Sequence, residues 1–189
     1  VRGGTLTVAT FTNIRSLDPA AGGDALSIEI SQGLFAGLVD FDEKGKLVPD
    51  LAERFEISED GLTLTFHLRE GVRFHDGATL TADDVVRSVE RSLHPDTPNP
   101  FASFFSRLAG LDAFQAKKAT HLAGVRAVSE REVRFSLTEK DATFLPLLTL
   151  PALRPVCRSA GRVYSDTWVP CGAGPFMLPP GGWDSGRSV

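Results

Sequence analysis

The stretch LTLTFHLREGVRFHDGATLTADDVVRSVERSL, residues 62–93, contains the change from strand to helix that decides the fold. Apolar residues occupy every second position of its first part: Leu62, Leu64, Phe66 and Leu68. This alternation predicts a strand with one buried face, and the segment 72–74 continues it as an adjacent antiparallel strand. From residue 82 onward the apolar period is helical: Ala82, Val85, Val86, Val89 and Leu93. This spacing predicts a helix over about residues 83–93 with one apolar stripe.

The same stretch contains a histidine and several carboxylates that together resemble an acid/base or metal site. His75 stands next to Asp76, and strand alternation directs the His75 ring toward solvent or a neighbouring strand. Asp76 belongs to an Asp-Gly turn dipeptide. Thr81 is placed to cap the helix, with Asp84 three residues later as a variant of the capping box. We therefore interpret these residues as structural, and a His/Asp hydrolase is the weaker alternative.

Hairpins and helices alternate along the rest of the chain, which predicts an α+β fold of antiparallel hairpins and mixed sheet packed with helices. Strands or hairpins are expected at residues 3–11, 39–49, 54–68, 124–139 and, after a turn, within 172–183. Helices are expected at about residues 25–38, 101–116 and 142–150, with one helical turn at 49–55. Helical periodicity favours a core position for Phe104 and leaves Phe101 undecided between the core and a cleft.

Composition and motifs argue against several classes of protein. The net charge of −4 and the scattered basic residues argue against nucleic acid or an anionic membrane as partner. No apolar stretch reaches the roughly 20 residues that span a bilayer. No dinucleotide, P-loop or nucleophile-elbow motif is present, and the histidines lack metal-ligand spacing. We expect no catalytic residues, metal or cofactor, and any signal peptide is expected to have been removed already.

Two cysteines, Cys157 and Cys171, flank a loop rich in Gly, Arg, Ser and Pro. Their spacing matches no CxxC or Cys/His metal pattern. They are either two unrelated buried thiols or a disulfide that closes the loop, which an exported protein would permit. If unstrained, such a disulfide would contribute about 3 kcal/mol to stability.

Several segments, in order along the chain, resemble the family 5 extracellular solute-binding proteins of ABC importers. They are GGTLTVAT (3–10), SLDP (16–19), the long segment 34–93, LAGLDAF (108–114), VRFSLTEKDATFLPLL (133–148) and CGAGPFML (171–178). The resemblance implies a two-lobed periplasmic-binding-protein fold of type II, of which this chain would be the N-terminal portion only. It divides the chain into the first part of lobe I (1–46), an inserted subdomain (47–156) and a return into lobe I (157–189).

The resemblance also implies a set of ligand-contacting residues. Thr12, Asn13 and Ile14 match the stretch before SLDP whose backbone faces the ligand in peptide-binding relatives. Phe101 matches a position that often carries a tyrosine directed toward the cleft, and here the hydroxyl is missing. Relatives usually have Gly-Thr-Gly-Pro where this chain has Gly-Ala-Gly-Pro at residues 172–175, so a polar role of that loop is weakened.

The function implied by the resemblance is capture of a peptide or similar small solute for delivery to ABC permease subunits. The expected location is periplasmic or extracellular, and a lipid anchor outside this sequence would add peripheral membrane association. Since half of the cleft would be missing, these residues alone are expected to bind poorly. A stand-alone protein-interaction module, pairing through an exposed strand edge, is the alternative from another class.

Overall fold

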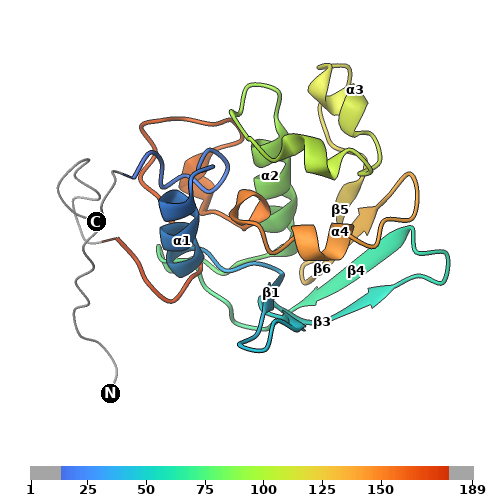
Figure 1. Cartoon of the computed structure of the whole chain (residues 1–189), viewed down its shortest axis with the longest axis horizontal. Helices are drawn as coiled ribbons and strands as arrows, with labels where there is room; N and C mark the ends of the chain where they lie inside the picture. Colours follow the sequence, from blue (N-terminus) through green and yellow to red (C-terminus); the bar gives the residue numbers. More distant parts are fainter. Residues whose placement is uncertain (1–13, 179–189) are drawn as a thin grey trace.

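The computed structural model describes residues 14–178 (Figure 1). The expected strand at residues 3–11 lies outside this range. The α-helices are α1 (Ala25–Leu34), α2 (Ala82–Leu93), α3 (Leu111–Gln115) and α4 (Phe144–Leu147). The strands are β1 (Val39–Phe41), β2 (Leu47–Pro49), β3 (Ala52–Ile57), β4 (Thr63–Leu68), β5 (Val125–Ser129) and β6 (Glu132–Ser136). Short 3-10 helices span Ala102–Phe105, Pro151–Leu153 and Arg158–Ala160.

A four-stranded antiparallel sheet in the order β3-β4-β6-β5 forms the base of the larger core. The predicted alternation in β4 is confirmed, because Leu64, Phe66 and Leu68 are buried while the residues between them are partly exposed. Phe66 pairs with Val133 of β6, and its ring meets that of Phe135 edge-on with 5.6 Å between centroids. Apolar burial on this face stabilises the sheet.

Two expectations around this sheet are wrong. The segment 72–74 is not a third strand, since the second neighbour of β4 is β6 and Arg73 makes only an isolated bridge with Thr79. The expected helical turn at 49–55 is a strand instead, because most of it belongs to β3 and pairs with β4. Pairing with β4 in the adjacent hairpin overrides the helical preference of 49–55, and β6, from far along the chain, takes the place beside β4 that was expected for 72–74.

The predicted helix after residue 82 is confirmed as α2, which packs on β5 and β6. Figure 1 shows it between α1 and the sheet. The Thr81 N–H and hydroxyl both donate to Asp84 Oδ2, at 3.1 and 2.9 Å, so the expected capping contact is present. Val85, Val89 and Leu93 are fully buried on the sheet side. The apolar stripe therefore orients α2, as the spacing indicated.

The other helices are shorter than expected. Helix α1 ends at Leu34, because Phe35 adopts an extended conformation and its N–H donates to Ser31 O. The expected helix over 101–116 is broken into a 3-10 turn and α3, with Gly110 in the left-handed region between them (φ 77°). The segment 172–178 contains no strand. Within residues 14–178, no helix has the length and apolar character needed to cross a membrane.

The buried apolar residues form two clusters. The larger core lies between the sheet, α2 and the segments around α4. The smaller cluster consists of Leu17, Leu34, Phe35, Val156 and Ala160. It brings the segment before α1, the end of α1 and the 156–160 segment together, so residues far apart in sequence form one contact region.

Candidate functional site

The structure does not gather the predicted ligand-contacting residues into one cluster. Thr12 and Asn13 lie outside the described residues. Ile14 is partly buried against the smaller cluster, whereas Phe101 is partly buried against the larger core. Their role in ligand contact therefore stays a prediction.

The segment that follows Ile14 meets the loop that carries Phe101. A β-carbon added to Gly23 would lie only 2.9 Å from Pro100 Cγ, so the two segments touch. A separate hollow of about 500 Å³ lies between α1 and the β1–β2 hairpin, and neither Ile14 nor Phe101 lines it. The contact between Gly23 and Pro100 therefore brings the segment before α1 next to the loop 99–101, which carries Phe101.

Phe101 is held at the start of the 3-10 turn by Asn99, whose side chain is in turn bound to the end of α2. Its N–H donates to Asn99 Oδ1 at 2.8 Å, and the Asn99 amide donates to Ser92 Oγ at 2.9 Å. The ring of Phe104 lies 6.0 Å from that of Phe101. Phe104 is 51% exposed, so its expected core position is wrong, and the break of the helix explains why. Phe101 and Phe104 together form an aromatic pair at the surface, which periodicity did not indicate.

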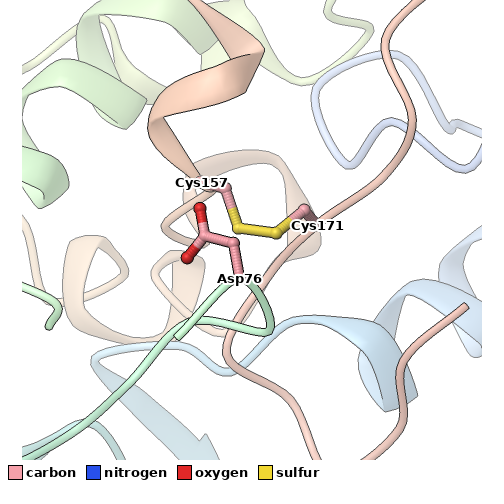
Figure 2. A group of neighbouring side chains, drawn as sticks. All are labelled: Asp76, Cys157 and Cys171. Carbon is pink, nitrogen blue, oxygen red and sulfur yellow. A yellow bond between two sulfur atoms is a disulfide. The ribbon is translucent and has the colours of Figure 1, made fainter. Parts of the chain in front are cut away.

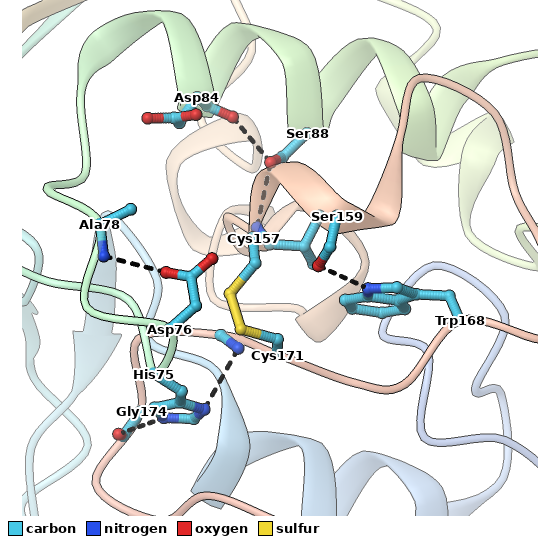
Figure 3. Close-up of a disulfide and its surroundings, with 12 residues drawn as sticks. His75, Asp76, Ala78, Asp84, Ser88, Cys157, Ser159, Trp168, Cys171 and Gly174 are labelled. Atoms are coloured by element: carbon cyan, nitrogen blue, oxygen red, sulfur yellow. Dashed lines mark hydrogen bonds between the residues drawn. A yellow bond between two sulfur atoms is a disulfide. The ribbon is translucent and has the colours of Figure 1, made fainter.

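The His75 ring faces the loop 172–174, so its expected orientation toward solvent or a neighbouring strand is wrong. Its backbone N–H donates to Gly172 O at 2.8 Å. Ring atom Nδ1 accepts from the Gly172 N–H (3.3 Å), so Nε2 carries the proton and donates to Gly174 O (2.9 Å; Figure 3). Because both ring nitrogens are engaged with backbone, His75 has no free lone pair for general-base chemistry.

Asp76 occupies the turn expected for it and lies beside a disulfide. Its Oδ1 accepts from the Ala78 N–H at 3.0 Å. Cys157 and Cys171 are joined, with their Cα atoms 5.4 Å apart (Figure 2). Within the described part of the chain, these three residues are the one group of three or more His, Cys, Asp or Glu side chains with metal-binding proximity. In the oxidised state the sulfurs are bonded to each other and provide no thiolate ligands.

Replacing both cysteines by serine is expected to lower the free energy of unfolding by about 3 kcal/mol. The bridge joins positions 14 residues apart, so its loss returns chain entropy to the unfolded state. Urea unfolding followed by circular dichroism measures the change. Wild type treated with a reductant is the matched comparison and is expected to lose a similar amount; an unchanged midpoint in both would contradict a stabilising disulfide.

The glycines of the loop 172–174 allow a close approach to the end of α1. Gly174 N–H donates to Leu34 O at 3.0 Å, and Phe176 N–H donates to Gly33 O at 3.0 Å. A β-carbon on Gly174 would lie 2.5 Å from Gly33 O and 2.6 Å from Phe35 N. The Gly-x-Gly-Pro motif is therefore explained by backbone packing.

A buried ion pair joins α2 to the SLDP segment. The Arg91 side chain is 1% exposed, and its guanidinium donates to both oxygens of Asp18, at 3.1 and 2.5 Å. Arg91 Nε also donates to Ala160 O at 3.1 Å, and the guanidinium carbon lies 5.1 Å from the centre of the Trp168 ring. These contacts connect segments more than 60 residues apart in sequence, and no local pattern indicated them.

A second buried arginine, Arg154, lies where two segments of the chain run side by side. Its guanidinium donates to Phe35 O (2.5 Å), Asp40 Oδ2 (2.8 Å) and Thr149 O (3.1 Å). Nearby, Asp50 Oδ2 accepts from a backbone N–H, but burial of this carboxylate outweighs that bond and raises its pKa. Segments 35–40 and 149–154 are thereby held together.

The Asp84 carboxylate, which caps α2, also binds Arg158 from a segment far along the chain. Burial alone would raise the pKa of its carboxyl, but hydrogen bonds from Arg158 and Thr81 outweigh burial and hold that pKa below its usual value. Arg158 donates to both carboxylate oxygens, at 2.8 and 2.7 Å. The Asp84 carboxylate therefore anchors the segment after Cys157 to the start of α2.

Backbone hydrogen bonds and buried ion pairs thus hold the segments around α1 and α2 together, with Phe104 exposed beside the partly buried Phe101. The pattern that describes the middle of bacterial extracellular solute-binding proteins, family 5, matches residues 46–189. The oligopeptide-binding protein OppA of Escherichia coli is 33% identical over 167 residues, covering 87% of this chain and 31% of OppA. The glutathione-binding protein GsiB of Salmonella typhi is 30% identical over 173 residues, covering 90% of this chain and 31% of GsiB.

The fold agrees with this match. The murein tripeptide binding protein MppA of Escherichia coli superposes with a TM-score of 0.80 at 32% identity, over 88% of this chain and 34% of MppA. The mixed α+β structure thus matches a portion of a periplasmic binding protein of type II. The chain belongs to family 5 of the bacterial extracellular solute-binding proteins. It spans about 31% of the length of the curated relatives it matches.

Proposed function

We propose that this chain is part of the substrate-binding component of an ABC importer, which captures peptides or similar small solutes outside the cytoplasmic membrane. The observation that carries this proposal is family membership together with the likeness to OppA, an oligopeptide-binding protein. GsiB and MppA, which bind glutathione and a murein tripeptide, support a peptide-like ligand. The component has no catalytic step and hands its ligand to permease subunits.

The proposed location is the periplasm or the extracellular side of the membrane, as the periplasmic relative OppA suggests. A lipid anchor outside this sequence would hold the protein at the membrane. In the proposed two-lobed architecture, residues 1–46 and 157–189 belong to lobe I and 47–156 to an inserted subdomain. The hydrogen bonds of Arg154 that join segments 35–40 and 149–154 support this division, because they lie near the two points where the chain would enter and leave the subdomain.

The proposed mechanism is closure of two lobes on the ligand, which shifts the population toward the form that a permease binds. Thr12, Asn13, Ile14 and Phe101 are the proposed contacts from this chain. Phe104 extends the set, because its exposed ring lies next to that of Phe101. These residues alone supply part of the cleft, so they are expected to bind peptide weakly.

Replacing Phe101 or Phe104 by alanine in the full-length protein is expected to weaken peptide binding about tenfold, because an aromatic contact with the ligand is lost. Isothermal titration with defined short peptides measures the affinity. Phe41→Ala is the matched control, because Phe41 on β1 is 49% exposed, close to the 51% of Phe104. Equal peptide affinity of all three variants and wild type would show that Phe101 and Phe104 do not contact the ligand. A wild type that binds no peptide would overturn the proposed ligand class.

A further inference from the structure

Asp76 and the disulfide form a cluster that the proposed function does not use. One Asp76 carboxylate oxygen and the sulfurs of Cys157 and Cys171 all lie within 4.8 Å of one another. Figure 2 shows the carboxylate beside the sulfur bridge. The turn bond to the Ala78 N–H uses Oδ1, and Figure 3 shows the other oxygen on the side of Cys157. This oxygen is available to a cation.

The backbones of the two cysteines are held together by contacts that do not need the sulfur bridge. The Cys157 N–H donates to Cys171 O at 2.9 Å. On one side, the Val156 N–H donates to Ser88 Oγ of α2 at 3.0 Å. On the other side, the His75 clasp fixes the residue after Cys171. Reduction of the bridge therefore leaves two thiols at neighbouring, pre-positioned backbone sites.

Reduction needs an external thiol as electron donor, for example a dithiol. Its two thiols lose two electrons and two protons and form a disulfide, while the Sγ–Sγ bond breaks and Cys157 and Cys171 become thiols. A metal ion that then binds the sulfurs displaces the two thiol protons to solvent. The reduction thus balances in electrons and protons, and metal binding only releases the two thiol protons.

We propose that the reduced chain binds one thiophilic divalent cation of the Zn²⁺ type through Cys157, Cys171 and Asp76, with water as the fourth ligand. Two thiolates and one carboxylate suit the tetrahedral coordination of Zn²⁺. With Zn–S bonds of about 2.3 Å the sulfurs must lie about 3.8 Å apart. The Cα separation of 5.4 Å allows this through side-chain rotation alone. Ca²⁺ and Mg²⁺, which prefer oxygen ligands, are disfavoured.

Burial gives this site a single open side. Cys157 is fully buried and Cys171 partly buried, whereas Asp76 is exposed. A cation thus enters past the carboxylate, and the water ligand lies on the same side. His75 is a positioning residue here rather than a ligand, because both of its ring nitrogens hold the backbone of the loop 172–174.

Titration of the reduced, untagged chain with Co²⁺, followed by competition with Zn²⁺, tests the proposal. A sulfur-to-cobalt charge-transfer band that saturates at one equivalent and is abolished by Zn²⁺ is expected. Asp76→Asn is expected to weaken Co²⁺ binding about tenfold or more while leaving the turn intact, since the asparagine oxygen still accepts from the Ala78 N–H. Asp83→Asn, which changes an exposed carboxylate in the first turn of α2, is the matched control and is expected to bind like wild type.

Each other outcome counts against the site. No charge-transfer band in the reduced chain would overturn it, and so would equal binding by the oxidised chain. Equal affinity of Asp76→Asn and wild type would remove the carboxylate from the coordination sphere. Circular dichroism of the reduced chain must show the fold of the oxidised one; loss of that fold would contradict the claim that backbone contacts alone keep the cysteines in place.

Discussion

Replacing Gly174 by alanine is expected to lower the free energy of unfolding by about 4 kcal/mol or more, a loss well above that of an ordinary substitution. The new β-carbon would lie 2.5 Å from Gly33 O and 2.6 Å from Phe35 N, and backbone atoms cannot turn aside as a flexible side chain does. The loop must move away from α1. It then loses the bond from Gly174 N–H to Leu34 O and the contact of His75 Nε2 with Gly174 O.

Urea unfolding of Gly174→Ala, followed by circular dichroism, measures the loss. Gly45→Ala is the control, because Gly45 has φ 73° and nothing within 4 Å of an added β-carbon. That variant carries only the cost of a left-handed backbone, about 1–2 kcal/mol. A Gly174→Ala variant no less stable than Gly45→Ala would show that the loop 172–174 is not closely packed on α1.

Local patterns were sufficient for the elements whose stability is local. The helix α2, with its cap at Thr81 and its buried stripe through Val85 and Val89, follows from spacing and capping chemistry. The β3–β4 and β5–β6 hairpins follow from alternation around short turns. The pairing of β4 with β6 did not follow, because it joins residues about 70 positions apart and rests on apolar burial that no short window contains.

The candidate site was predictable to a smaller extent. The family resemblance pointed to Phe101, but Phe104 lies in a short 3-10 helix rather than a long α-helix, so the α-helical apolar period does not describe its exposed position. His75 was interpreted as structural, and that interpretation agrees with its clasp on the loop 172–174. The clasp itself was not foreseen, because its partners lie about 97 to 99 positions away.

Breaking the ion pair between Arg91 and Asp18 is expected to cost about 3–5 kcal/mol of stability. Arg91→Met keeps most of the side-chain volume but leaves the Asp18 carboxylate buried, with side-chain exposure of only 7%, and without its cation. Among residues 14–178, the hydrogen bond that would remain to the Asp18 carboxylate is the one from the Ala20 N–H (2.9 Å). The stacking of the guanidinium on Trp168 is lost as well.

A double-mutant cycle of Arg91→Met and Asp18→Asn separates the pair from its surroundings. Arg91→Met leaves the Asp18 charge buried without a partner, and Asp18→Asn removes that charge. The double variant is therefore expected to lose less stability than the sum of the two single losses. The exposed pair of Arg54 and Glu53 is the control, with N···O 3.2 Å and side chains 56% and 46% exposed. Arg54→Met is expected to cost less than about 1 kcal/mol. Strict additivity in the cycle would mean that Arg91 and Asp18 stabilise the protein independently, and that burial, not pairing, determines the cost of each change.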